Sequence, residues 1–129
     1  DPMQKTKENT DYDFDLALKY CIENINEISF CCGSHNEKST LFLVELMKKH
    51  KIKNNDSRIY FAQLLGMSDH ISKNIAKENY NTAKYVPYGP VKDVTPYLIR
   101  RAQENTSVKG QTGRELSLIL KEQKRRKAS

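Results

Sequence analysis

One helical face in the sequence gathers side chains suited to binding a small anion. An aromatic ring, two guanidinium groups and a carboxylate are spaced i, i+3, i+4 and i+7, which places them on one side of a helix: Tyr97, Arg100, Arg101 and Glu104. Guanidinium groups bind carboxylates through two parallel hydrogen bonds, and a helix N-terminus adds favourable potential for an anion. Thr95-Pro96 fits an N-cap followed by proline at the first helical position, so we expect the helix to begin beside this face. The alternative is a solvated face in which Arg100 and Glu104 form an ordinary ion pair.

Two further polar features follow or interrupt apolar segments. Ser34, His35 and Asn36 come after the apolar run Ile28–Cys32 and could donate hydrogen bonds to a cofactor, whereas Ser34 or Asn36 could instead cap the next helix. Gln63 lies inside an apolar segment, and a buried amide there needs a partner, which is either a ligand or a neighbouring strand. Leu65 follows on the same face at i+2. We predict no metal site, because the other histidines lie in unrelated segments and no acidic residue repeats with ligand spacing.

The elements that must position these residues alternate between helix and strand. The hydrophobic patterns predict helices over Asp11–Asn26, Glu37–Lys49 and Ser68–Glu78, the last with Ser68 as N-cap, a final helix marked by Leu116, Ile119 and Leu120, and strands over Ile28–Cys32, Ile59–Leu65 and Thr82–Val86. This alternation implies parallel strands that are adjacent and in chain order. Three unusual motifs lie at or just after the end of a strand, which favours part of a (β/α)8 barrel over a small open sheet: Gly33–Asn36, Gln63–Met67 and Tyr85–Gly89.

Composition narrows the class of protein. The chain carries a net charge of +6, but the basic runs are not interleaved with aromatic residues, so we predict no nucleic-acid partner. No apolar run reaches the roughly 18 residues of a membrane helix. The three cysteines lack metal or disulfide spacing and are expected to be reduced thiols in the core. Because the chain begins at Asp1 without a methionine, we expect it to be a piece of a longer protein.

Several long motifs resemble the C-terminal half of the proline dehydrogenase family over nearly the whole chain. Ser34-His-Asn-Glu37 is similar to the family's flavin-binding loop, and Tyr60-Phe-Ala-Gln-Leu-Leu-Gly-Met-Ser-Asp69 is similar to its penultimate strand. The run Lys84–Arg101, which contains Tyr-Val-Pro-Tyr-Gly-Pro and Tyr-Leu-Ile-Arg-Arg, resembles the last strand and helix. The resemblance implies that residues 1–129 are a single domain, an α/β fold made of about three parallel strands with covering helices from a (β/α)8 barrel.

The resemblance also implies an activity and a role for each motif residue. The activity is FAD-dependent oxidation of L-proline to 1-pyrroline-5-carboxylate. The substrate would contact Arg100, Arg101, Tyr85, Tyr97 and Leu65. The FAD would contact Ser34, His35, Asn36, Gln63 and Arg101, with Glu104 holding an arginine in place. No residue of this chain is assigned as catalytic, since the cofactor performs the hydride chemistry and the protein orients the reactants.

The family's earlier motifs are absent from this chain, so the resemblance implies that the isolated piece is inactive. The expected partners are L-proline, a quinone or other electron acceptor, and the upstream half of the same barrel. The expected location is the bacterial cytoplasm, with room for peripheral association with the inner membrane, and the alternative is the mitochondrial matrix. The alternative function is a non-catalytic α/β module for interaction or scaffolding.

Overall fold

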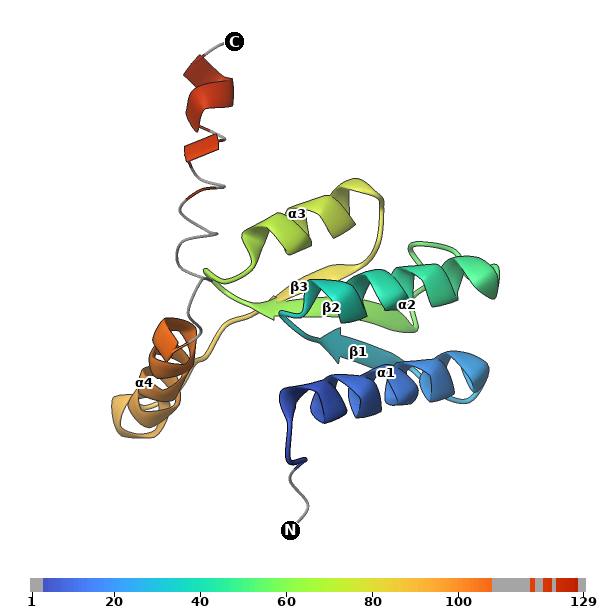
Figure 1. Cartoon of the computed structure of the whole chain (residues 1–129), viewed down its shortest axis with the longest axis horizontal. Helices are drawn as coiled ribbons and strands as arrows, with labels where there is room; N and C mark the ends of the chain where they lie inside the picture. Colours follow the sequence, from blue (N-terminus) through green and yellow to red (C-terminus); the bar gives the residue numbers. More distant parts are fainter. Residues whose placement is uncertain (1–3, 108–116, 118–119, 122, 128–129) are drawn as a thin grey trace. The chain divides into compact units, whose positions relative to one another are not determined.

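The computed structural model describes residues 4–107, 117, 120–121 and 123–127, and the chain forms two compact units, Asp1–Val86 and Pro87–Ser129 (Figure 1). The first unit contains a sheet with three helices, and the second contains one long helix. Leu116 and Ile119, which mark the last predicted helix, lie outside the described residues.

The sheet of the first unit consists of three parallel strands in the order β1-β2-β3. These are β1 (Phe30–Gly33), β2 (Ile59–Leu64) and β3 (Thr82–Tyr85). The helix α1 (Lys7–Glu23) precedes the sheet, and α2 (Glu37–Lys49) and α3 (Asp69–Lys77) connect its strands. The predicted α/β class and the parallel order in sequence are therefore confirmed.

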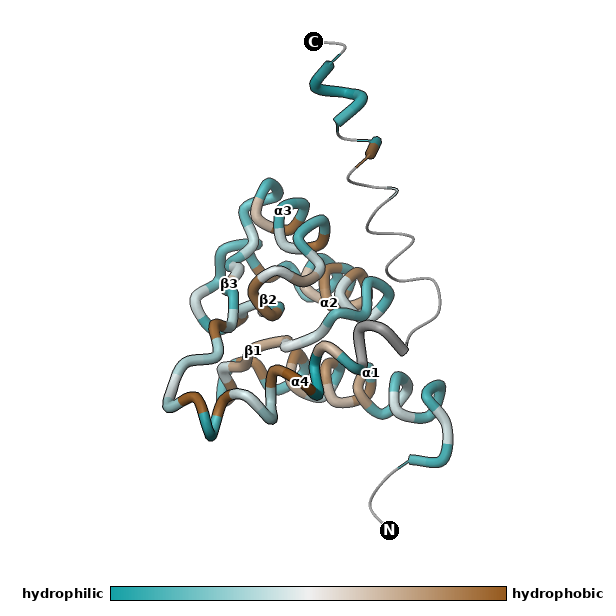
Figure 2. Tube along the Cα trace, turned by 90° about the vertical axis from the view of Figure 1, so that its left-hand side faces the viewer, coloured by the Kyte–Doolittle hydropathy of each residue, from teal (hydrophilic) through white to brown (hydrophobic). Residues whose placement is uncertain are grey.

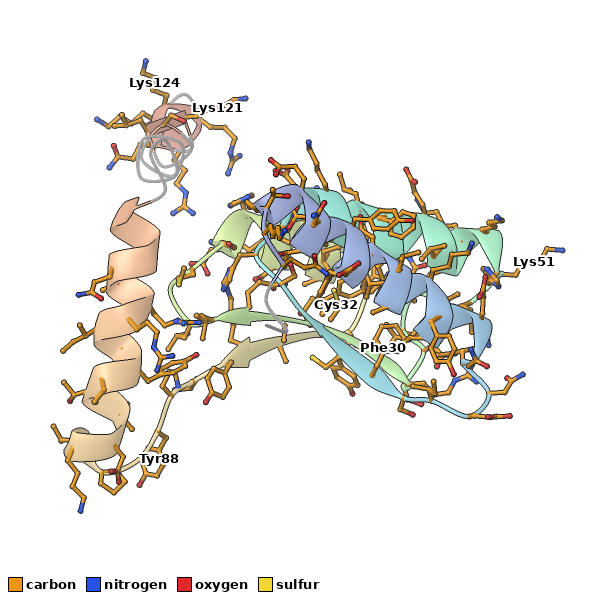
Figure 3. All side chains as sticks on the ribbon, turned by 60° about the horizontal axis from the view of Figure 1, so that its bottom comes forward. Phe30, Cys32, Lys51, Tyr88, Lys121 and Lys124 are labelled. Atoms are coloured by element: carbon orange, nitrogen blue, oxygen red, sulfur yellow. The ribbon has the colours of Figure 1, made fainter. Side chains whose placement is uncertain are left out.

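The three helices of this unit lie on one face of the sheet (Figure 3). Residues of β2 alternate between buried and more exposed positions, so every second side chain contributes to the core beneath the helices. The largest fully buried side chains of this core are Phe61, Ile22, Leu43, Met47 and Ile59. Figure 2 shows hydrophobic residues running through β2 and α2, while α3 alternates along its turns as an amphipathic helix does.

The opposite face of the sheet carries exposed side chains. Tyr60 is 43% exposed and Tyr85 is 56% exposed, and Cys31 pairs in register with Tyr60 on that same face. The expectation that all the cysteines lie in the core is therefore wrong for Cys31, because neighbouring residues of a strand point to opposite faces. Cys32 does lie in the core, where burial raises the pKa of its thiol to about 12.

Two predicted helix boundaries are wrong. The helix α1 begins four residues before the predicted Asp11, because Thr6 caps it by accepting a hydrogen bond from the Asn9 amide at 3.2 Å. The helix α4 (Val91–Ser107) contains Pro96 in its interior, so Thr95 is not its N-cap. The carbonyl of Pro90 begins this helix by accepting hydrogen bonds from the amides of Asp93 and Val94 at 2.9 and 3.0 Å.

The Arg58 side chain connects the residues just before β2 to the segment that follows α1. Arg58 donates to both carboxylate oxygens of Asp56 at 2.9 and 2.8 Å and to the Ile25 carbonyl at 3.1 Å. The Asp56 carboxylate also accepts the Arg58 backbone amide at 3.0 Å. These hydrogen bonds from Arg58 lower the pKa of Asp56 to about 2.

We predict that Asp56→Asn lowers stability at neutral pH and that this difference disappears in acid. The pKa of Asp56 is lowered in the folded state, so its charged form stabilises the fold above its ordinary pKa of about 3.9. This contribution is lost as the pH falls through the folded value of about 2. Urea unfolding of both proteins across this pH range measures it. The control Asp11→Asn, which removes the exposed pair with Lys7, should have a smaller effect. A difference that persisted unchanged at pH 2 would contradict the prediction.

Candidate functional site

The carboxyl ends of the parallel strands form one edge of the first unit, and the loops that follow β1 and β2 meet there. The loop after β1 pairs with β2 through a hydrogen bond from the Ser34 amide to the Ala62 carbonyl at 3.2 Å. The loop after β2 pairs with β3 through a hydrogen bond from the Leu65 amide to the Tyr85 carbonyl at 3.0 Å. Because parallel strands end at the same edge, side chains of the two loops come within reach of one another.

The Asn36 side chain has a structural role at this edge. Its Oδ1 accepts hydrogen bonds from the backbone amides of Lys38 and Ser39 at 3.0 and 3.5 Å, which caps α2. The pKa of Asp11 is lowered chiefly by a hydrogen bond from Lys7 and also by the Asn36 side chain. Asn36 therefore caps α2, which is the alternative to a cofactor contact that the sequence left open.

The amide of Gln63 is buried and joins two segments of the chain. Its side chain is 3% exposed, its Nε2 donates to the Ser34 carbonyl at 3.3 Å, and its Oε1 accepts from the Ser72 hydroxyl at 2.7 Å. Gln63 thus binds its neighbours in the fold, which was one of the two alternatives. Leu65, expected on the same face as Gln63, lies beyond the end of β2 and is 60% exposed.

The ring of His35 contacts the loop after β2. Its Nδ1 lies 2.8 Å from the hydroxyl of Ser68, a residue that is distant in sequence and 4% exposed. Ser68 is the N-cap residue of α3, as predicted, but its backbone is left-handed and its hydroxyl makes no capping bond. The hydroxyl is directed to His35 instead.

Lys84 stabilises the loop after β2, a role that the sequence pattern did not suggest. Its Nζ donates to the Met67 carbonyl and to Asp69 Oδ1, both at 2.7 Å. The hydrogen bond from Lys84 lowers the pKa of Asp69. Gly66, at a φ of 78°, supplies the left-handed turn that this loop needs. The available signal was a lysine inside the otherwise apolar strand run Thr82–Val86.

The second unit holds the arginine face on α4. The guanidinium carbon of Arg101 lies 5.2 Å from the centroid of the Tyr97 ring, a cation–π contact that confirms their shared face. Arg101 is half-buried and Arg100 is exposed, while the Glu104 side chain lies outside the described part of the structure. Since α4 begins at Val91, its N-terminus is about 15 Å along the axis from Arg101. The expectation that the helix dipole favours anion binding at this face is therefore wrong, because the effect of the dipole fades within the first turn of a helix.

In the ranges that the structure describes, no three histidine, cysteine or acidic side chains form a group that could hold a metal ion. None of the helices described is both long and apolar enough to cross a membrane.

The fold and site define a segment of an α/β barrel in which polar side chains gather at the carboxyl ends of parallel strands. The family model for proline dehydrogenase matches residues 1–114, and the chain belongs to that family. It is 40% identical over 129 residues to the mitochondrial proline dehydrogenase 1 of Bos taurus, covering 98% of this chain and 22% of the relative. It is 38% identical over 130 residues to the hydroxyproline dehydrogenase of Xenopus laevis, covering 98% of this chain and 28% of that protein.

A solved structure shows the same fold. The crystal structure of proline utilization A from Bdellovibrio bacteriovorus, inactivated by N-propargylglycine, matches with a TM-score of 0.75 and 31% identity over 84% of this chain and 11% of that one. This similarity and the parallel strand order confirm the predicted partial (β/α)8 barrel. The chain spans about a fifth of the length of its bovine relative.

We predict that Ser72→Ala destabilises the first unit by about 1–3 kcal/mol, because it leaves the buried Oε1 of Gln63 without its hydroxyl donor. Urea unfolding monitored by circular dichroism measures the loss. The matched control is Ser57→Ala, which changes an exposed serine and should have little effect. Equal stability of the two variants would show that the bond from Ser72 to Gln63 contributes nothing.

Proposed function

We propose that residues 1–129 form the C-terminal part of the barrel of a flavin-dependent proline dehydrogenase. The reaction is the oxidation of L-proline to 1-pyrroline-5-carboxylate. The observation that carries the proposal is the family match over residues 1–114, which covers the strands whose carboxyl ends hold the polar cluster. The alternative of a non-catalytic module has no comparable support in the sequences this chain matches.

The polar edge of the first unit has the hydrogen-bonding groups that FAD requires. Ser34 offers a hydroxyl and His35 a ring nitrogen, and both residues are half-buried beside a loop fixed by Gln63 and Asn36. We propose that Ser34 and His35 contact FAD directly. Asn36 caps α2 through its side-chain oxygen, and Gln63 donates one hydrogen bond from its amide nitrogen. The side-chain amide groups of both residues therefore keep hydrogens that can be donated to FAD. When bound, FAD supplies the acceptor for the hydride that leaves the ring carbon beside the proline nitrogen.

The arginine face of α4 suits the substrate carboxylate. We assign Arg100 and Arg101 to binding that carboxylate through paired hydrogen bonds, with Arg101 also contacting the cofactor. The Tyr97 ring supports the Arg101 guanidinium through their contact at 5.2 Å. Glu104 is assigned to holding an arginine in place. The preference for arginine follows from its planar fork, which a lysine lacks.

Tyr85 and Leu65 are assigned to the apolar ring of the substrate. Both side chains are exposed, at 56% and 60%, and their backbones are joined at the carboxyl end of β3. An exposed aromatic and an exposed aliphatic side chain at a strand end are available to cover a small apolar body. These residues orient the substrate and exclude water, and neither transfers a proton.

The relatives suggest the setting in which this chain works. Several are named mitochondrial, which favours the mitochondrial matrix over the bacterial cytoplasm. The partners we propose are L-proline, a quinone or other electron acceptor, the upstream part of the same barrel and a membrane surface contacted peripherally. Because two of the relatives are named hydroxyproline dehydrogenase, 4-hydroxyproline is the competing substrate to test.

Purification of the full-length protein tests the cofactor assignment. We expect a yellow protein that releases FAD on denaturation and that reduces a dye acceptor when proline is added. A colourless protein that neither binds added FAD nor oxidises proline or 4-hydroxyproline would favour the non-catalytic alternative.

We predict that the isolated 129-residue chain oxidises proline poorly or not at all. Among the described residues its sheet has three strands and exposes Tyr60 and Tyr85, and the chain spans about a fifth of its bovine relative. The measurement is proline-dependent dye reduction with added FAD, with the full-length protein as positive control. A rate close to that of the full-length protein would show that the chain needs no other part of the barrel.

We predict that Arg101→Lys in the full-length enzyme weakens proline capture far more than it harms folding. Lysine keeps the charge but loses the planar fork, a loss on the order of 1.5–3 kcal/mol for hydrogen bonds to a charged group. This corresponds to a decrease in kcat/KM of roughly ten- to hundredfold. Steady-state kinetics and a thermal melt test both parts together. An unchanged kcat/KM with a much lower melting temperature would make Arg101 a structural residue.

A further inference from the structure

Ser68 departs from two local rules at the start of α3. An N-cap residue ordinarily has extended backbone angles and accepts a hydrogen bond from the first turn of its helix. Ser68 instead has φ 52° and ψ 40°, in the left-handed region, and its hydroxyl makes no capping bond. This conformation is unfavourable for residues other than glycine, so the surroundings must hold it.

Lys84 holds the chain on both sides of Ser68. Its amino group donates to the carbonyl of Met67, the residue before, and to the carboxylate of Asp69, the residue after, both at 2.7 Å. The carbonyl of Ser68 also accepts the Ile71 and Ser72 amides at 3.0 and 3.2 Å. The strained backbone is therefore fixed at several points, and the side chain that it orients is 4% exposed.

The direction of the hydrogen bond to His35 follows from the burial of Ser68. A buried hydroxyl must donate its hydrogen to an acceptor. Among the residues that the structure describes, the acceptor within reach of this hydroxyl is Nδ1 of His35, at 2.8 Å. With the hydroxyl as the donor to Nδ1, a neutral imidazole carries its proton on Nε2.

We propose that Ser68 is a positioning residue that fixes the ring proton of His35 on Nε2 and so prepares this histidine to donate a hydrogen bond to FAD. This inference rests on the proposed function, in which His35 contacts the cofactor. The strain at Ser68 is explained by this role, because the left-handed backbone turns the hydroxyl from the amides of α3 toward the loop after β1.

The variant Ser68→Gly separates this role from folding. Glycine adopts the left-handed conformation without penalty but lacks the hydroxyl, so we expect the melting temperature to stay within about 4 °C of the wild type. The matched control is Asn79→Gly, at φ 62°, which relieves the same backbone conformation at an exposed position after α3. The control should leave both the His35 ring and FAD binding unchanged.

Nitrogen NMR of the histidine rings, recorded on the unliganded 129-residue chain at about pH 8, tests the first step directly. We expect His35 to carry its proton on Nε2 in the wild type and a mixture of tautomers in Ser68→Gly. A proton on Nδ1 in the wild type, or an unchanged tautomer in the variant, would overturn the inference.

Fluorescence titration of the full-length protein with FAD tests the second step. We expect Ser68→Gly to weaken FAD binding roughly two- to tenfold, the effect of one lost hydrogen bond, and to have no further effect once His35 is replaced by alanine. If the variant changes the tautomer but keeps wild-type FAD affinity, or weakens binding equally without His35, the positioning role is wrong. A wild-type protein that binds no FAD would instead overturn the proposed function, while the NMR result on Ser68 and His35 would still hold.

Discussion

The buried amide of Gln63 is the interaction on which the polar edge of the sheet depends. A buried amide must satisfy both its donor and its acceptor groups, and Gln63 does so with the Ser34 carbonyl and the Ser72 hydroxyl. One partner lies just after β1 and the other lies within α3. The hydrogen bonds of this one side chain therefore join two consecutive βα units. The loop that carries His35 is held in place by the hydrogen bond from Gln63 to the Ser34 carbonyl.

The sheet itself is only half covered within its unit. The helices bury the face that carries Ile59 and Phe61, whereas Tyr60 and Tyr85 remain exposed on the other face. Within the part of the chain that the structure describes, the outer strands β1 and β3 each pair on one side only, and a closed barrel would remove these free edges. Both features are expected of strands taken from a (β/α)8 barrel, whose inner face is filled by side chains from all eight strands. The exposed Tyr60 is therefore a position at which the rest of such a barrel would complete the core.

Hydrophobic period and capping chemistry were enough to predict much of this fold. The bounds of α2 are predicted from Asn36 as a possible cap and from the apolar residues Leu41, Val44 and Met47, although Leu41 is 55% exposed and Leu43 is buried instead. The start of α4 could not be predicted in the same way. Pro96 fits the first position of a helix, but α4 begins earlier, with the carbonyl of Pro90 accepting its first hydrogen bonds. The sequence alone does not show which of the two prolines stands at the start of the helix. The roles of Ser68 and Lys84 depend on contacts between distant segments, which no local pattern encodes.

The candidate site residues of the first unit support the fold as well as the proposed ligand. Asn36 caps α2, Gln63 bridges two segments, and His35 contacts a strained serine. A substitution at any of these positions removes a structural bond together with a proposed ligand contact, so lost activity alone does not assign a role to the residue. Arg100 differs, because its side chain is exposed on α4 and its replacement should cost little stability. Ligand binding and unfolding must therefore be measured on the same variants, and a residue belongs to the site when its replacement weakens binding by more than its effect on stability explains.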